Sequence, residues 1–320
     1  MTTSTLLAPG LARLVDAVRL DVVGMTATLG PRSLRAANAV DLRAQVSAAI
    51  YREWHAGIRD DPTVTGRRRT LLDTELAGRL LAAVRHADSP TTVEVLSHEA
   101  DGVVVDLGSA RVRVPSRLLD PSRIPAAGSA TVRLPAAHPA LSPGFVLVDG
   151  PEGAEESPTA RAVRRVFVHL LAPDVAPTAW GLVLEAANAV GGRYRAKVLS
   201  DRDGYPRRDA LVVYHAEDEV RLPAAVAEAV AGLPGVGAEV SEFCARLAPG
   251  VGASSEPADP RPGMTGLSFG QHRARLVTAG LFEAAHTGTD RADAVARHLV
   301  AGLVDPTDPS RNLDGRAEAS

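Results

Sequence analysis

The fold is decided by a short segment in the middle of the chain, Arg165-Val-Phe-Val-His-Leu170. With the period of two of a β-strand, its first, third and fifth side chains share one face and its three aliphatic side chains share the other. An alanine-rich helical pattern follows from about 178 to 190 and stops at Gly191-Gly192. The segment therefore predicts a strand whose aliphatic face is covered by a helix.

The next segments extend this pattern. Strands are predicted at 194–199 and 210–215, joined by the turn-forming run Asp201-Arg-Asp-Gly-Tyr-Pro206. In the first of them, Arg195 and Lys197 alternate with apolar residues. Helices are predicted near 224–233, 268–285 and 291–303. The order of elements predicts an α+β fold in which an antiparallel sheet is covered by helices.

The first half of the chain has a different organisation. Apolar spacing predicts three helices and then five short strands of a small antiparallel sheet, with helices at 11–22, 34–50 and 71–84 and strands at 93–96, 103–107, 112–114, 131–134 and 145–148. An acidic, turn-rich segment, 149–158, marks the predicted boundary. We expect a helical and small β part over 1–150, an α+β catalytic domain over 160–305 and a disordered tail over 306–320.

Composition excludes several classes of protein. Of 320 residues, 45% are hydrophobic and 23% charged, which is typical of a soluble globular protein. The formal net charge of -3 gives no global attraction to nucleic acid or to an acidic membrane. The only cysteine, Cys244, excludes an intramolecular disulfide. The start of the sequence has no basic residue before its apolar stretch, and no apolar run reaches the roughly 18 residues of a membrane span. We predict a cytoplasmic protein.

Lysine usage is strongly biased. Lysine and arginine together number 35, and Lys197 is the only lysine. Such a bias indicates a GC-rich coding sequence in which surface cations have become arginine. An arginine cannot replace lysine where a neutral amine is required. Lys197 is therefore a candidate for chemistry, although it can also be a chance survivor.

Familiar enzyme signatures are absent. The sequence has no phosphate-binding loop, no zinc-protease helix, no nucleophile elbow and no dinucleotide fingerprint. Its nine histidines lack metal-ligand spacing, so we predict neither a metal nor an organic cofactor. What remains is the polar face of the predicted sheet, where Arg165, His169, Lys197 and Tyr214 can converge. The alternative is that these residues cover a solvated face.

A second candidate is the segment Ser268-Phe-Gly-Gln-His-Arg273. Ser268 and Gln271 form a capping box, so a helix should begin here. His272 and Arg273 then lie near free backbone N–H groups, which favours an anion. The alternative is pairing with an acidic side chain such as Asp209 or Glu256. The aromatic group Tyr51, Trp54 and His55 is predicted to pack in the core or between domains.

These segments resemble a known family. Four strings follow the order and wording of the HopA-type type III effector family. They are Arg165-Val-Phe-Val-His169, Tyr194-Arg-Ala-Lys-Val-Leu199, Tyr205-Pro-Arg-Arg-Asp-Ala-Leu-Val-Val-Tyr214 and Ser268-Phe-Gly-Gln-His-Arg273. The resemblance covers roughly residues 160–300, and it extends weakly to Tyr51–Gly57.

The resemblance implies an activity. HopA-like proteins occur in actinobacterial gene clusters for ribosomally made, modified peptides, beside an aminoglycoside-phosphotransferase-like kinase. The kinase phosphorylates Ser and Thr of a precursor peptide. The HopA-like lyase then eliminates the phosphate and leaves dehydroalanine or dehydrobutyrine, as in lanthipeptides of class V and related thioamide peptides. The chain is thus expected to be a phosphoserine/phosphothreonine lyase.

The resemblance also implies roles for residues. It assigns Lys197 as the base and His169 as the acid, with His272 as the other candidate acid, and Tyr214 orients the lysine or the substrate. The expected phosphate ligands are Arg165, Arg207, Arg208 and Arg273, because guanidinium groups bind phosphate in a bidentate manner. Two other functions stay open: a non-catalytic adaptor that binds the precursor peptide or its kinase, and an effector-like protein that acts on a host target.

Overall fold

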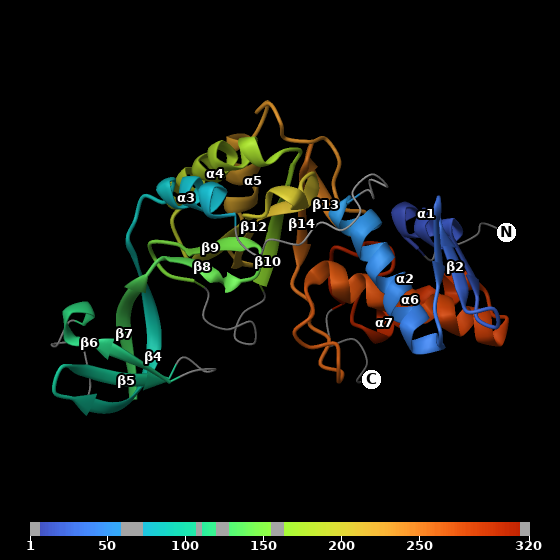
Figure 1. The fold of residues 1–320 in the computed structure, drawn as a ribbon, viewed down its shortest axis with the longest axis horizontal. Coiled ribbons are helices and arrows are strands. Elements are labelled where there is room, and N and C mark those ends of the chain that lie inside the picture. Colours follow the sequence, from blue (N-terminus) through green and yellow to red (C-terminus); the bar gives the residue numbers. More distant parts are fainter. Residues whose placement is uncertain (1–6, 59–72, 107–110, 120–127, 155–162, 314–320) are drawn as a thin grey trace.

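The structure is a computed structural model that describes residues 7–58, 73–106, 111–119, 128–154 and 163–313. Within these ranges the chain forms seven α-helices and three antiparallel sheets of three, seven and four strands. This confirms the predicted mixed α+β fold. Figure 1 shows the four-stranded sheet at one end of the molecule, the large sheet in the middle and a helical group at the other end.

The seven-stranded sheet is the centre of the fold. Its strand order is β13-β14-β10-β12-β11-β9-β8, with neighbouring strands antiparallel. The strands are β8 (Ala137–Ser142), β9 (Phe145–Asp149), β10 (Val163–Leu170), β11 (Tyr194–Leu199), β12 (Arg207–Ala216), β13 (Ala245–Ala248) and β14 (Val251–Ser255). The strands predicted at 165–170, 194–199 and 210–215 are therefore confirmed as β10, β11 and β12, whereas β13 and β14 had no clear signal in the sequence.

Three helices cover one face of this sheet (Figure 1). They are α3 (Thr74–Ala82), α4 (Ala176–Val190) and α5 (Leu222–Ala229). As the alternation predicts, Val166 and Val168 of β10 and Ala196 of β11 are fully buried in this layer. Trp180 of α4 is also fully buried, and its indole N–H donates to the Leu80 carbonyl over 3.2 Å.

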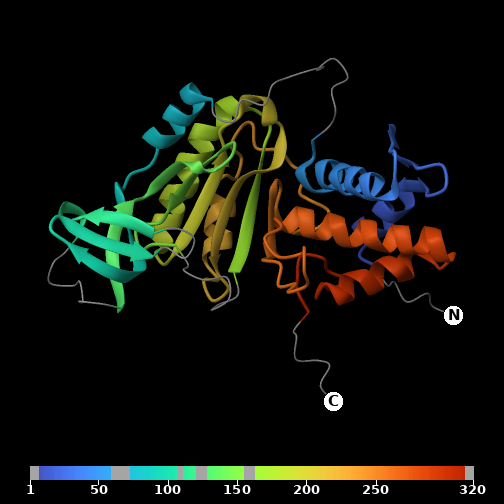
Figure 2. The same cartoon turned by 60° about the horizontal axis from the view of Figure 1, so that its bottom comes forward.

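The opposite face of the sheet is covered only in part. Phe167 and Val212 pack into a second core that is formed with the helical group. This group contains α1 (Pro9–Ala17), α2 (Ala39–Ile50), a π-helical turn η1 (Tyr51–Ala56), α6 (Phe269–Thr287) and α7 (Arg291–Ala301). In Figure 2, α2 lies alongside α6.

Two predicted N-terminal helices are shorter than expected. The first ends at Ala17 and continues as β1 (Val18–Asp21), which pairs with β2 (Thr26–Leu29) and leads to β3 (Arg32–Arg35). The second begins only at Ala39, because Asn38 caps it by accepting a hydrogen bond from the Asp41 N–H. Residues 71 and 72 of the third predicted helix lie outside the described residues.

The small sheet has the order β6-β5-β4-β7. Its strands are β4 (Asp88–Glu99), β5 (Gly102–Asp106), β6 (Arg111–Pro115) and β7 (Gly128–Pro135). The fifth predicted strand, at 145–148, belongs instead to the large sheet as β9, because it pairs with β11. The large sheet thus takes strands from both sides of the acidic segment.

The end of the chain is ordered further than expected. Val304 bridges Asn312, and Ser310 is buried at 1% exposure. The disorder predicted after residue 305 does not apply to 306–313, because this segment packs against the C-terminal helices and β14. Residues 314–320 lie outside the described part.

Candidate functional site

A pocket of about 280 Å³ opens on the face of the large sheet that the helices α3, α4 and α5 do not cover. It is lined by Ser142, Leu147, Val163, Arg195, Lys197, Tyr214 and Glu256. Strand periodicity places the two cations there, since their neighbours Ala196 and Val198 are buried in the opposite layer. The register pairs Arg195 with Tyr214.

Lys197 is held between two aromatic rings. Its Nζ lies 4.8 Å from the centroid of Phe145 and 5.6 Å from that of Tyr214. Within the described part of the chain, its ammonium makes no hydrogen bond or ion pair. Cation–π contacts position an ammonium without occupying its N–H donors. The lysine is therefore fixed in place and still able to bind or exchange a proton with a ligand.

The same motif extends across the sheet as a cation–ring row, which consists of Arg165, Tyr214, Lys197, Phe145, Arg207 and Tyr51. The Arg165 guanidinium carbon is 4.8 Å from the Tyr214 centroid. The Arg207 carbon is 5.6 Å from the Phe145 centroid and 5.9 Å from that of Tyr51. Three cations from three strands thus alternate with aromatic rings. The row brings together four of the predicted site residues: Lys197, Tyr214, Arg165 and Arg207.

Carboxylates hold the guanidinium groups around the pocket. Glu256 accepts a bidentate pair of hydrogen bonds from Arg165. Asp149 accepts from Arg195 over 2.5 and 3.0 Å. Burial raises the pKa of Asp149, but hydrogen bonds from His138 and Arg195 outweigh it and hold the pKa below its ordinary value. These pairs orient Arg165 and Arg195 and neutralise their charge. Lys197 differs, because its positive charge has no carboxylate partner among the described residues.

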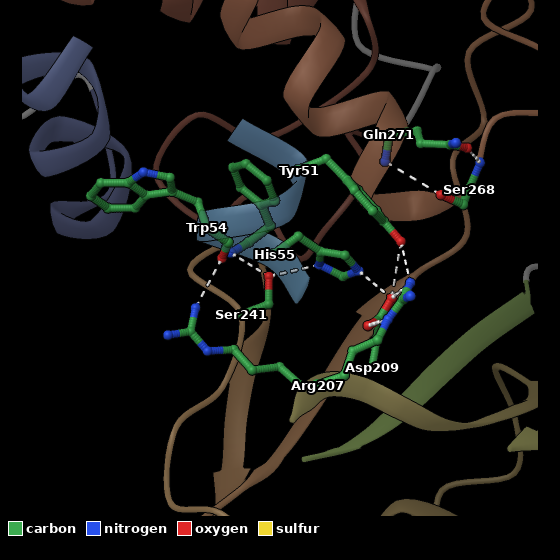
Figure 3. A network of polar contacts seen from close by, with 10 residues as sticks. Tyr51, Trp54, His55, Arg207, Asp209, Ser241, Ser268 and Gln271 are labelled. Atoms are coloured by element: carbon green, nitrogen blue, oxygen red, sulfur yellow. Dashed lines mark hydrogen bonds and ion pairs between the residues drawn. The ribbon is translucent and has the colours of Figure 1, made fainter. Parts of the chain in front are cut away.

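A buried polar network anchors one end of the row (Figure 3). Tyr51 Oη accepts from Arg207 Nη2 over 2.6 Å and donates to Asp209 Oδ2 over 3.3 Å. His55 Nε2 lies 3.5 Å from the same carboxylate, and His55 Nδ1 lies 2.8 Å from Ser241 Oγ. Burial opposes ionisation of Asp209, yet Arg207 and His55 hold its pKa well below the ordinary value. The network ties η1 to the start of β12.

Ser241, His55 and Asp209 have the connectivity of a hydrolytic triad, but their surroundings indicate a structural role. Ser241 is only 5% exposed, and its Oγ accepts a hydrogen bond from the Phe243 N–H over 3.1 Å. The His55 ring packs between Phe167 and Phe269. The prediction that the aromatic group around His55 packs between parts of the chain agrees with this arrangement.

The residues of the segment Ser268–Arg273 are occupied by structural contacts. Ser268 and Gln271 form the predicted capping box of α6. Gly270 lies against His55, because a Cβ at this position would be 2.1 Å from His55 Cδ2. His272 is fully buried, and its Nε2 is 3.1 Å from Asp259 Oδ2. The histidine therefore has a carboxylate partner, although it is neither of the two named from the sequence.

Arg273 is fully buried behind the same helix. It donates to the Pro309 carbonyl over 2.9 Å and to Asn312 Oδ1 over 3.0 Å, and it stacks 4.7 Å from the Phe269 centroid. Burial lowers its pKa to about 9. Burial and the neighbouring Arg273 lower the pKa of His272 to about 4. This pair joins α6 to residues 306–313 and does not line the pocket.

His169 and Arg208 lie at a third place in the fold, apart from the Lys197 pocket and from the His272–Arg273 pair. His169 lies at the irregularity that shifts the β10–β12 register after Val168, and its Nδ1 is 3.1 Å from the Glu239 carbonyl. Burial lowers its pKa. Arg208 donates to Glu239 Oε2 over 2.6 Å and to the Glu53 carbonyl over 3.2 Å. Neither residue lines the pocket that contains Lys197.

Several residues that line the pocket or contact its lining were not assigned from the sequence. Arg195 had a signal, because the period of two puts it on the same face as Lys197. Phe145 and Asp149 had none, and Glu256 was considered only as a partner of His272 or Arg273, because these three residues come from segments distant in the sequence that the fold brings together.

Residues 136–311 match the HopA1 effector protein family. The chain belongs to that family. The matched region contains every strand of the large sheet, the pocket and the C-terminal helices. No curated protein matches the chain.

Two solved structures resemble the fold. One is an effector protein from Pseudomonas syringae pv. tomato strain DC3000, with 13% identity, a TM-score of 0.47, and coverage of 85% of this chain and 99% of that chain. The other is an effector protein from Pseudomonas syringae pv. syringae strain 61, with 14% identity, a TM-score of 0.46, and coverage of 86% and 93%.

The described residues contain neither a metal-binding cluster nor a membrane-spanning helix. No group of three or more His, Cys, Asp or Glu side chains is arranged to hold a metal ion. No helix in these ranges is long and apolar enough to cross a membrane.

Proposed function

We propose that this member of the family is a phosphoserine/phosphothreonine lyase that β-eliminates phosphate from a kinase-phosphorylated precursor peptide. The observation that carries the proposal is Lys197, whose ammonium has no ion-pair partner among the described residues and lies in a pocket beside oriented guanidinium groups. A phosphorylated side chain needs both a base near Cα and cations near the phosphate, and this pocket offers both.

The reaction assigns one role to each side of the pocket. Lys197, as the neutral amine, takes the Cα proton, and the electron pair of that bond forms the Cα=Cβ bond. The Cβ–O bond breaks, and its electrons leave with the phosphate. Arg195, which lines the pocket, stabilises the departing charge by charge-assisted hydrogen bonds, and Arg165 and Arg207 of the cation–ring row add positive charge beside it. The product is dehydroalanine from phosphoserine or dehydrobutyrine from phosphothreonine.

Tyr214 is our candidate for the proton donor. It lines the pocket, and its ring contacts both Arg165 and Lys197. The phenol gives its proton to the departing phosphate, and the two cations stabilise the phenolate. The ammonium of Lys197 then returns a proton to the phenolate, which restores both groups. His169 and His272 are less suited, because burial lowers the pKa of both and neither lines the pocket.

The substrate and partner follow from the reaction. An upstream kinase, which we propose to be of the aminoglycoside-phosphotransferase type, supplies the phosphorylated peptide. The dehydrated residues are electrophiles, as lanthipeptide-type peptide maturation requires. The proposed chemistry uses side chains alone and requires no cofactor.

The test is Lys197→Arg, with a phosphorylated Ser/Thr peptide as substrate and mass spectrometry as the readout. The variant keeps the positive charge but cannot accept the proton, so we expect elimination to stop while phosphopeptide binding persists. Arg164→Lys, a conservative change at a residue that does not line the pocket, is the control and should eliminate at the wild-type rate. Elimination at the wild-type rate by Lys197→Arg would refute the proposed base.

An adaptor function gives a different result. If wild type eliminates nothing and calorimetry finds equal affinity for phosphorylated and unphosphorylated peptide, the chain is a non-catalytic binder.

A further inference from the structure

A second hollow lies between α2 and α6, the two helices that lie side by side in Figure 2. The helices are antiparallel, since Arg43 stacks 4.8 Å from the Phe282 centroid at one end and Gly270 lies against His55 at the other. The groove has a volume of about 640 Å³. Its lining repeats at helical spacing on both helices, with Val40, Arg43, Ala44 and Ser47 from α2 and Arg275 and Thr278 from α6.

The chemistry of the lining defines the ligand. The floor is made mainly of small and aliphatic side chains, and Val40 is 76% exposed at its rim. Arg43 and Arg275 flank it, and no acidic residue among those that the structure describes lines it. Arg275 donates to the Gly263 carbonyl over 2.6 Å, and within the described residues neither arginine has a carboxylate partner. The guanidinium groups around the Lys197 pocket are paired with carboxylates, whereas, in the described part of the chain, those of Arg43 and Arg275 are not. The groove complements a segment that carries both apolar and acidic side chains.

Tyr51 connects this groove to the pocket. Its ring lines the groove, while its hydroxyl accepts a hydrogen bond from Arg207 of the cation–ring row. From the Tyr51 ring the row leads to Lys197 through separations of 5.9, 5.6 and 4.8 Å. An extended chain rises about 3.3 Å per residue, so roughly five residues span that path. A spacer of about five residues is therefore long enough to connect a segment in the groove to a phosphorylated side chain at Lys197.

We propose that the α2–α6 groove binds an acidic, apolar segment of the peptide substrate, about five residues from the phosphorylated side chain. This rests on the proposed lyase function and adds a docking element to it. Groove binding raises the local concentration of the phosphoresidue at Lys197. The enzyme would then select peptides by a segment that does not react.

The test compares synthetic peptides with a phosphoserine and a five-residue Gly/Ala spacer. One set carries a Glu/Leu segment before or after the spacer, a second carries Lys in place of Glu, and a third has no segment. We expect one of the two placements of the Glu/Leu segment to give a KM that is about tenfold or more below that of the peptide without a segment. Arg43→Glu/Arg275→Glu should abolish that advantage and transfer it to the Lys peptide.

Two further variants isolate the groove. Ala44→Trp places a bulky ring in it without a change of charge and should also abolish the advantage. Arg85→Glu/Arg111→Glu carries the same charge change at exposed positions outside the groove and should retain the full advantage. Thermal unfolding verifies that each variant is folded.

The outcomes separate this inference from the lyase proposal. If wild type eliminates phosphate but the advantage is absent or unaffected by both groove variants, the groove proposal is wrong and the lyase stands. If nothing is eliminated, fluorescence anisotropy with the unphosphorylated Glu/Leu peptide tests the groove alone. Binding that Ala44→Trp removes supports the groove, and no binding overturns it. A wild-type dimer that Ala44→Trp makes monomeric in sedimentation assigns the groove to a second copy and also overturns it.

Discussion

Burial of His272 should make the folded state sensitive to acid. The imidazole is fully buried, and burial together with Arg273 lowers its pKa from 6.5 to about 4. The unfolded chain therefore binds this proton more tightly than the folded chain between pH 6.5 and 4. The free energy of unfolding is consequently highest above pH 6.5 and falls as the pH falls towards 4.

The size of the effect follows from the shift. One pKa unit corresponds to about 1.4 kcal/mol, so the full contribution is about 3 kcal/mol, of which about 2 kcal/mol is lost between pH 7 and pH 5. His272→Gln keeps an amide donor near Asp259 but does not titrate. We expect this variant to be less stable at pH 7 and to lose about 2 kcal/mol less than wild type on going to pH 5.

Urea unfolding at both pH values measures this difference, with circular dichroism and the fluorescence of the buried Trp180 as probes. His98→Gln, at an exposed position of β4, is the matched control and should show the wild-type pH dependence. Equal losses in wild type and His272→Gln would show that His272 is not a buried neutral imidazole, and the assignment of a structural role to it would have to be reconsidered.

Two further predictions concern packing and phosphate binding. Gly270→Ala should destabilise the protein by about 1–3 kcal/mol in thermal unfolding, because the Cβ of the new alanine would overlap the buried His55 ring. Gly181→Ala in α4 is the control and should be neutral or slightly stabilising, because a Cβ there meets only Ala83 at 3.8 Å. Arg195→Gln should destabilise the protein by about 1–3 kcal/mol, since it leaves the buried Asp149 carboxylate without its charged arginine partner. In calorimetry the same variant should reduce the preference for phosphorylated over unphosphorylated peptide by about 1.5–3 kcal/mol, and an unchanged preference would remove Arg195 from the proposed clamp.

Local pattern was sufficient for much of the architecture. The alternation in β10 and β11 predicted which side chains face the helical layer, and Val166, Val168 and Ala196 are indeed fully buried. The capping box at Ser268 predicted the start of α6, because cap and helix are only three residues apart. These predictions succeed because the periods of strands and helices, and the satisfaction of their terminal N–H groups, depend on neighbouring residues in the sequence.

The arrangement of the candidate site depended on long-range contacts. Lys197 was singled out from the sequence because it is the only lysine, and Tyr214 was expected near it on the same sheet face. Nothing in the sequence indicated that Phe145 would lie against the lysine as well. Nor could it separate Arg165 and Arg207, which join the cation–ring row, from Arg273, which is buried against residues 306–313.

The residues alone thus determined the fold class, the faces of the main strands and one candidate base. The tertiary structure decided which cations meet, because strand order and register bring β9, β11 and β12 together. Phe145 of β9 and Val212 of β12, the cross-strand partner of Lys197, are 67 positions apart in the sequence. It also decided which charges are neutralised, since the carboxylates that pair with Arg165 and Arg195 come from distant segments, Glu256 and Asp149. Charge pairing and burial depend on distance in space, and a periodic pattern along the chain does not contain that information.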